Sequence, residues 1–133
     1  MTPPGDDVQF GSQRVVDVFV AVPVGRIDHP NAELLKDALA PIVNAAAADK
    51  NALVLDFSGV EYISSMGLRV LLMASKQLRA ANARIAVAAL QPVAQEIFDI
   101  ARFNHVVEIY PSVRAALGQL SAPALAAFEA AAT

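Results

Sequence analysis

Ser64 and Ser65 are the residues of this chain whose position could best support chemistry. They follow an apolar segment, residues 52–57, and a short loop, and they open an amphipathic stretch with helical spacing that runs to about residue 81. This order places a serine hydroxyl at the positive end of a predicted helix. No base stands nearby in the sequence to make it a nucleophile. We therefore interpret Ser65 as a residue that is acted upon.

Other kinds of chemistry find little support in the sequence. There is no cysteine, and the two histidines, His29 and His105, show no metal-ligand spacing with carboxylates. A nucleophile elbow and a glycine-rich phosphate loop are both missing. A response-regulator receiver domain would need an acidic pair after its first strand and a late lysine, whereas Lys76 is the last lysine here. We expect no enzyme activity, no metal and no cofactor.

The composition predicts one globular domain. The 133 residues are 56% hydrophobic and 17% charged, with a net charge of −3, which argues against nucleic acid or an anionic membrane as partner. The N-terminus lacks the basic and apolar regions of a signal peptide, and the longest apolar stretches, residues 18–24 and 85–90, are too short to span a bilayer. Together with the absence of cysteine, this favours a soluble cytoplasmic protein.

Strand-like and helix-like segments alternate along the chain. Residues 1–7 are predicted to form a flexible tail, and the alanine-rich residues 121–133 are predicted to form an extension that either adds one or two helical turns or frays. This alternation over residues 8–120 predicts an α/β domain, with a mixed, mostly parallel central sheet of four to five strands and about four helices. The expected strands are residues 15–24, preceded by an edge strand at 8–10, then 52–57, 84–90 and 106–110. The expected helices are 32–48 with Asn31 as N-cap, one from residue 64 or 65 to about 81, 92–102 and 112–120.

The helix after Ile63 has three faces on a helical wheel. One face is a stripe predicted to pack on the sheet: Leu68, Leu71, Leu72, Ser75 and Leu78. A second face, roughly opposite, carries Met66, Val70, Met73 and Gln77, and an edge between the two carries Ser65, Arg69 and Lys76. An apolar outer face is unusual. Either another helix or the C-terminal tail covers it, or it is a partner-docking patch, for which methionine is well suited.

The two serines have different expected roles. Serine is a favoured N-cap residue, and by the wheel Ser64 points inward, as a cap or packing residue should, while Ser65 points outward. Gly67 costs about 1 kcal/mol in a helix relative to alanine, so its place in the first turn suggests that something approaches the backbone closely there.

Two separated motifs resemble the STAS domain of bacterial anti-sigma-factor antagonists. Residues 56–68 (DFSGVEYISSMGL) match the family's pattern around its phosphorylated serine. Residues 25–28 (GRID), with Asn31-Ala32 after them, match a second family feature. By this resemblance Ser65 falls on the phosphoacceptor. Ser64 stands where the family usually has aspartate, and Met66 stands where it usually has a small hydroxyl residue.

The resemblance implies a partner-switching role. The unmodified protein would bind an anti-sigma factor that is also a serine kinase, the kinase would phosphorylate Ser65, and a serine phosphatase would reset the cycle. The partner-binding residues implied here are Ser64, Met66, Gly67, Arg69, Val70, Met73 and Asp28. An alternative keeps the fold but not the phosphorylation: an interaction module that docks on an ATPase, transporter or sensor complex.

Overall fold

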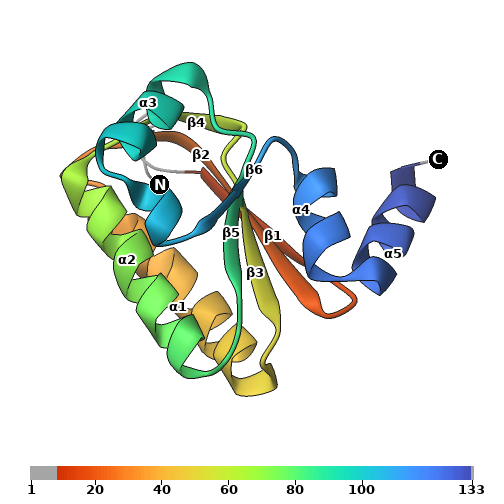
Figure 1. Ribbon diagram of the computed structural model, residues 1–133. Helices are drawn as coiled ribbons and strands as arrows, with labels where there is room; N and C mark the ends of the chain where they lie inside the picture. Colours follow the sequence, from red (N-terminus) through yellow and green to blue (C-terminus); the bar gives the residue numbers. More distant parts are fainter. Residues whose placement is uncertain (1–8, 133) are drawn as a thin grey trace.

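The structure is a computed structural model that describes residues 9–132. A six-stranded sheet forms the centre of this part of the chain (Figure 1). Strands β1 (Gln9–Val15) and β2 (Val18–Ile27) form an antiparallel hairpin. The order continues from β2 through β3 (Ala52–Asp56) and β5 (Ile85–Ala88) to β6 (Glu108–Tyr110), all parallel. The sixth strand, β4 (Gly59–Ile63), pairs in parallel with β2 alone.

Strand β2 changes its parallel partner halfway along its length. It pairs with β3 up to Ala21 and with β4 from Val24 onward, and the register shifts between Gly25 and Arg26. Pro23 falls in the gap between the two pairings, so its missing N–H removes no bond to either parallel strand. Gly25 has a φ of 118°, a conformation that a side chain would strain. The end of β2 is thereby directed toward β4.

Five α-helices cover the sheet of the described chain, on two faces (Figure 1). On one face lie α1 (Ala32–Asp49), α2 (Ser65–Ala80) and α3 (Pro92–Ile100), and on the other α4 (Val113–Leu120) and α5 (Ala122–Ala132). Central strand β3 alternates between the two: Leu53 and Leu55 enter the larger core with α1 and α2, and Val54 enters the smaller core with α4. Phe98 anchors α3 to the larger core.

The predicted mixed, mostly parallel α/β fold is confirmed, but the described chain has six strands where four to five are expected, and five α-helices where about four are expected. The strand expected at residues 15–24 is β2, but its limits differ: Val16, with a φ of 56°, lies in the turn between β1 and β2, and β2 continues to Ile27. The segment before α2, which is expected to be a loop, contains strand β4, and residues 122–132 form a full helix whose Ala124 is buried in the smaller core. The predicted tail, residues 1–7, lies outside the described residues. Between α3 and β6 the chain adds a 3₁₀ turn, Phe103–His105.

Candidate functional site

Ser64 links the end of β4 to the start of α2 as a buried N-cap. Its Oγ accepts a hydrogen bond from the backbone N–H of Gly67 at 3.2 Å, and its side chain is almost fully enclosed. Its own backbone N–H donates to the carbonyl of Ile27 at the end of β2, at 2.7 Å. The helix therefore starts at a point that is tied to two strands, and the inward orientation expected for Ser64 is observed.

Ser65, the first residue of α2, points to solvent. Its side chain is exposed, and its hydroxyl forms no hydrogen bond with any residue of the described chain. The first turn of α2 contains no acidic residue, so the positive end of this helix is not compensated from within the turn. Arg69 is exposed one turn further on. A free hydroxyl at such a position can be modified with an anionic group without the loss of a hydrogen bond within the described chain.

Gly67 is required by the close approach of α2 to the ends of β2 and β4. A Cβ built on it would lie 2.7 Å from Cγ2 of Ile27 and 2.7 Å from Cγ1 of Ile63. Carbon atoms do not approach this closely without a shift of the structure. The close backbone contact expected from the sequence is thus found inside the domain. Gly67 and Ser64 are both buried. Any contribution of these two residues to partner binding would therefore be indirect, through the position of α2.

The motif at residues 25–28, with Asn31-Ala32 after it, forms a tight connection from β2 to α1 beside this helix start. Oδ1 of Asp28 accepts a hydrogen bond from the backbone N–H of Asn31 at 3.1 Å. Nδ2 of Asn31 donates back to the carbonyl of Arg26 at 2.6 Å. Asn31 is at the N-cap position of α1, as predicted, but its side chain makes no capping bond. Its Nδ2 is used in this link, and its Oδ1, the atom that would accept a capping bond, is buried without a hydrogen-bond partner in the described chain. Asp28 is half-buried, and its predicted role in partner binding stays a prediction.

The apolar outer face of α2 is open to solvent. Met66 is 37% exposed and Met73 55% exposed, while Val70 between them is half-buried. Together with α1 these side chains line a groove of about 670 Å³. The C-terminal helix α5 lies on the opposite face of the sheet (Figure 1). Of the two explanations that the sequence allowed, coverage by this chain's own C-terminal segment is therefore wrong, and no described segment covers the groove.

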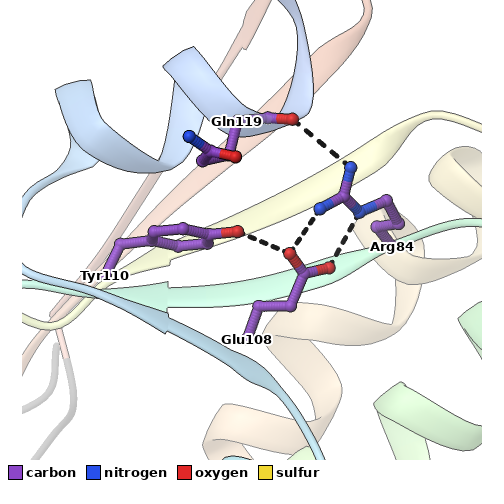
Figure 2. Close-up of polar contacts among 4 residues, drawn as sticks. All are labelled: Arg84, Glu108, Tyr110 and Gln119. Carbon is purple, nitrogen blue, oxygen red and sulfur yellow. Dashed lines mark hydrogen bonds and ion pairs between the residues drawn. The ribbon is translucent and has the colours of Figure 1, made fainter.

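A second polar cluster, which the sequence did not reveal, lies at the β5–β6 edge under α4. Figure 2 shows Arg84 donating two hydrogen bonds to the carboxylate of Glu108, from Nε at 2.8 Å and from Nη2 at 2.5 Å. The hydroxyl of Tyr110 donates to the same carboxylate at 2.6 Å, and Nη1 of Arg84 reaches the carbonyl of Gln119 at 3.4 Å. Arg84 and Glu108 are 24 residues apart, so only the strand order could have brought them together.

This cluster changes the ionisation of its members. Hydrogen bonding from Arg84 is the main reason that the pKa of Glu108 is lowered, with a smaller contribution from Tyr110. The pKa of Tyr110 is raised, first by its burial and then by its hydrogen bond to Glu108. All of these charges are matched within the domain, so the cluster ties β6 to β5 and α4 and leaves no group free for a ligand.

Within residues 9–132 there is no group of three or more potential metal ligands. His29 and His105 are both exposed. In the same part of the chain, none of the helices combines the length and the apolar character that a membrane crossing requires.

Comparison with known proteins accounts for both motifs. The model of the STAS domain family matches residues 12–116, which run from within β1 into α4 and include both motifs. The chain belongs to the STAS domain family. A candidate anti-sigma factor antagonist of Bordetella bronchiseptica, BtrV, is 33% identical over 103 residues, which cover 77% of this chain and 86% of BtrV.

Solved structures share this STAS fold. An anti-sigma factor antagonist from Mycobacterium paratuberculosis superposes with a TM-score of 0.74 at 25% identity, over 90% of this chain and 98% of that one. The unphosphorylated form of SpoIIAA, also an anti-sigma factor antagonist, superposes with a TM-score of 0.67 at 17% identity, over 84% of this chain and 95% of that one. The phosphorylated form of SpoIIAA, from Bacillus, superposes with a TM-score of 0.61 at 16% identity, over 84% of this chain and 98% of that one.

Proposed function

We propose that this STAS domain is an anti-sigma factor antagonist that binds an anti-sigma factor through the surface around Ser65. The observation that carries the proposal is the exposed, unbonded hydroxyl of Ser65 at the uncompensated start of α2. The identity with BtrV over most of both chains supports it. The protein acts by binding, in the cytoplasm, and its partner carries any catalytic activity.

Phosphorylation of Ser65 would control this binding. An ATP-dependent serine kinase, in this proposal the anti-sigma factor itself, transfers the γ-phosphoryl group of ATP to the Ser65 oxygen. ADP leaves, and the hydroxyl proton passes to a base of the kinase. A serine phosphatase then hydrolyses the phosphate ester with water. SpoIIAA, which has the same fold, is known in both forms, which supports such a cycle.

The electrostatics of α2 explain why the modified domain would remain folded. A phosphoserine adds about −1.5 to −2 charges at neutral pH. At the start of a helix, backbone N–H groups and the dipole stabilise that charge, and the unpaired guanidinium of Arg69 lies one turn away. Ser64 provides the N-cap that an aspartate would otherwise provide, so its replacement of the usual family residue keeps the helix start intact.

The cost of the new charge falls on the complex instead. One unfavourable charge contact near 4 Å costs about 4 kcal/mol at an effective dielectric of 20. Because 1.4 kcal/mol corresponds to about tenfold in affinity, such a contact weakens binding roughly a thousandfold.

The test compares Ser65→Glu and Ser65→Ala with the parent protein, by calorimetric titration of the cognate anti-sigma factor. We expect Ser65→Glu to bind roughly a thousandfold more weakly, and Ser65→Ala to bind like the parent and to resist phosphorylation. Ser12→Glu, on the exposed side of β1, is the matched control and should change nothing. Equal affinities for all of these variants would disprove the switch.

A second candidate function is favoured by one observation, the replacement of the usual acidic residue by Ser64. In this alternative the domain is a STAS interaction module that docks on an ATPase, transporter or sensor complex without being phosphorylated. Incubation with the cognate kinase and ATP, followed by intact-mass spectrometry, separates the two. A mass increase of one phosphoryl group that is lost in Ser65→Ala supports the switch, and an unchanged mass supports the module.

A further inference from the structure

The groove between α1 and α2 is an elongated surface that starts beside Ser65. It runs along α2 from Met66 to Gln77, which at 1.5 Å per residue is about 17 Å, or three helical turns. At its far end Nε2 of Gln77 donates to Oδ1 of Asn44 on α1 at 2.6 Å. Figure 1 shows the two helices lying side by side along the same face of the sheet. The groove therefore has the length of a short helix, and a hydrogen bond joins its two walls at one end.

The floor of this groove is apolar. Leu39 and Val43 of α1 and Val70 of α2 lie at its base, and Met66 and Met73 line its open side. Methionine side chains are flexible and polarizable, and they are common on surfaces that accept apolar side chains of a partner. A surface of this kind binds an amphipathic helix through side chains spaced i, i+3, i+4 and i+7.

The charged residues of the groove are mostly cationic and have no partner in the domain. Lys36, Arg69 and Lys76 line it, against a single carboxylate from Glu33. None of these three cations forms an ion pair or a side-chain hydrogen bond within residues 9–132. The whole chain carries a net charge of −3, so this local excess of positive charge is opposite in sign to the overall balance.

We propose that the α1–α2 groove binds an acidic amphipathic helix of the partner protein, with an apolar stripe in the groove and carboxylates against Lys36, Arg69 and Lys76. Charge complementarity selects the occupant, because a neutral or basic helix would leave these cations unpaired. The inference rests on the proposed function only in taking the partner to be an anti-sigma factor. It extends the contact surface beyond the start of α2 to α1 and to about three turns of α2.

A second copy of this chain offers a similar helix but fits less well. On α3, Val93 and Ile100 are exposed, with Glu96 and Asp99 also on the surface. However, α3 has nine residues, which span about 13 Å, and its Phe98 is fixed in its own core. It would fill only part of the groove, so we favour a separate partner.

Two synthetic peptides of about four helical turns test the proposal. Both have the same leucine stripe at i, i+3, i+4 and i+7; one has glutamates beside the stripe and the other has lysines. In NMR titrations of the labelled full-length protein at low salt, we expect the glutamate peptide to shift amide signals of α1 and α2. Three exposed charge pairs, each worth a few-fold, should make it bind about tenfold more tightly than the lysine peptide. The difference should shrink at about 1 M salt, where the Debye length falls to about 3 Å.

The double variant Lys36→Glu/Lys76→Glu should reverse the preference for the two peptides. Its matched control, Lys50→Glu/Arg102→Glu, makes the same charge change at exposed positions outside the groove and should keep the original preference. Equal binding of the two peptides, binding outside α1 and α2, or no binding by either would overturn the proposal. So would a sedimentation experiment in which the free protein self-associates and the Lys36→Glu/Lys76→Glu variant does not.

The outcome is separable from that of the proposed function. If the peptides fail while Ser65→Glu still abolishes binding of the anti-sigma factor, the groove proposal is wrong and the switch stands. If the peptides bind as expected while Ser65→Glu has no effect, the groove proposal stands and the switch is wrong.

Discussion

Arg69 and Arg84 are both exposed arginines on this domain, yet their surroundings differ. Arg84, at the β5–β6 edge, donates to both oxygens of Glu108 and to the carbonyl of Gln119. Arg69, on α2, forms no ion pair or side-chain hydrogen bond within the described chain, and it lies beside exposed methionines and a free hydroxyl. Burial does not explain this difference, because both side chains are open to water. The β5–β6 edge uses its charges to hold its own strands, and the α1–α2 surface leaves its charges free for a partner.

The largest effect on stability should come from the contact under the start of α2. In Gly67→Ala the new Cβ meets Ile27 and Ile63 at 2.7 Å, and overpacking of this kind costs about 2 kcal/mol. Gly118→Ala in α4 is the matched control, since its Cβ would lie an ordinary 3.5 Å from Leu125. Alanine in a helix interior should stabilise that variant by up to about 1 kcal/mol. Urea unfolding measures both, and similar effects at the two positions would show that the α2 contact is not special.

A smaller loss is expected when the N-cap of α2 is removed. Ser64→Ala deletes the acceptor of the Gly67 N–H, which costs about 1 kcal/mol. Ser64→Asp keeps an acceptor at the same place and should remain close to the parent in unfolding experiments. If Ser64→Asp were as unstable as Ser64→Ala, the side chain would matter for packing rather than for capping.

The smallest effect is expected at the β5–β6 edge, and it depends on pH. The pKa of Glu108 is lower in the folded protein than its ordinary value of 4.5, so its ionised form stabilises the fold above that value. This contribution is lost as the pH falls below 4.5 toward the lowered folded pKa. Because the pair is partly exposed, the loss should be about 0.5 kcal/mol.

Glu108→Gln tests this contribution in thermal unfolding at several pH values. The stability difference between the variant and the parent should be present at pH 7 and should disappear under acid conditions. The raised pKa of Tyr110 has the opposite consequence: its contribution is complete below the ordinary value of 10.0 and is lost as the pH rises beyond it. A pH-independent difference for Glu108→Gln would contradict the assigned ionisation.

Most of the fold could be predicted from local pattern, because the helices and central strands have clear periodicity. The sequence predicts α2 from residue 64 or 65 to about residue 81, and the observed helix, Ser65–Ala80, agrees to within a residue at each end. Leu71, Ser75 and Leu78 are buried, as the helical wheel predicts. Leu68 and Leu72 are only partly buried, because Gly67 and Ala74 take the closest positions. The limits of β2 were misplaced, since its pairing with two different parallel strands is a tertiary property.

The candidate site was predictable to a similar extent. The capping role of Ser64 and the outward position of Ser65 followed from residue type and helical geometry. The contribution of α1 to the groove did not, because Lys36, Leu39 and Val43 meet α2 only through the packing of two helices on one face of the sheet. Strand β4 had a usable signal in its valine, tyrosine and isoleucine, but its serine-rich neighbourhood suggested a loop.

The contact of Gly67 with Ile27 and Ile63 has a consequence for how such a domain would carry information. The start of α2 rests directly on two strand ends and has no slack in which to move. A regulatory modification at this position would therefore act through its charge, without a movement of the helix. Such a modification could be added and removed repeatedly without refolding of the domain, and the partner protein would need only to respond to the local electrostatic potential.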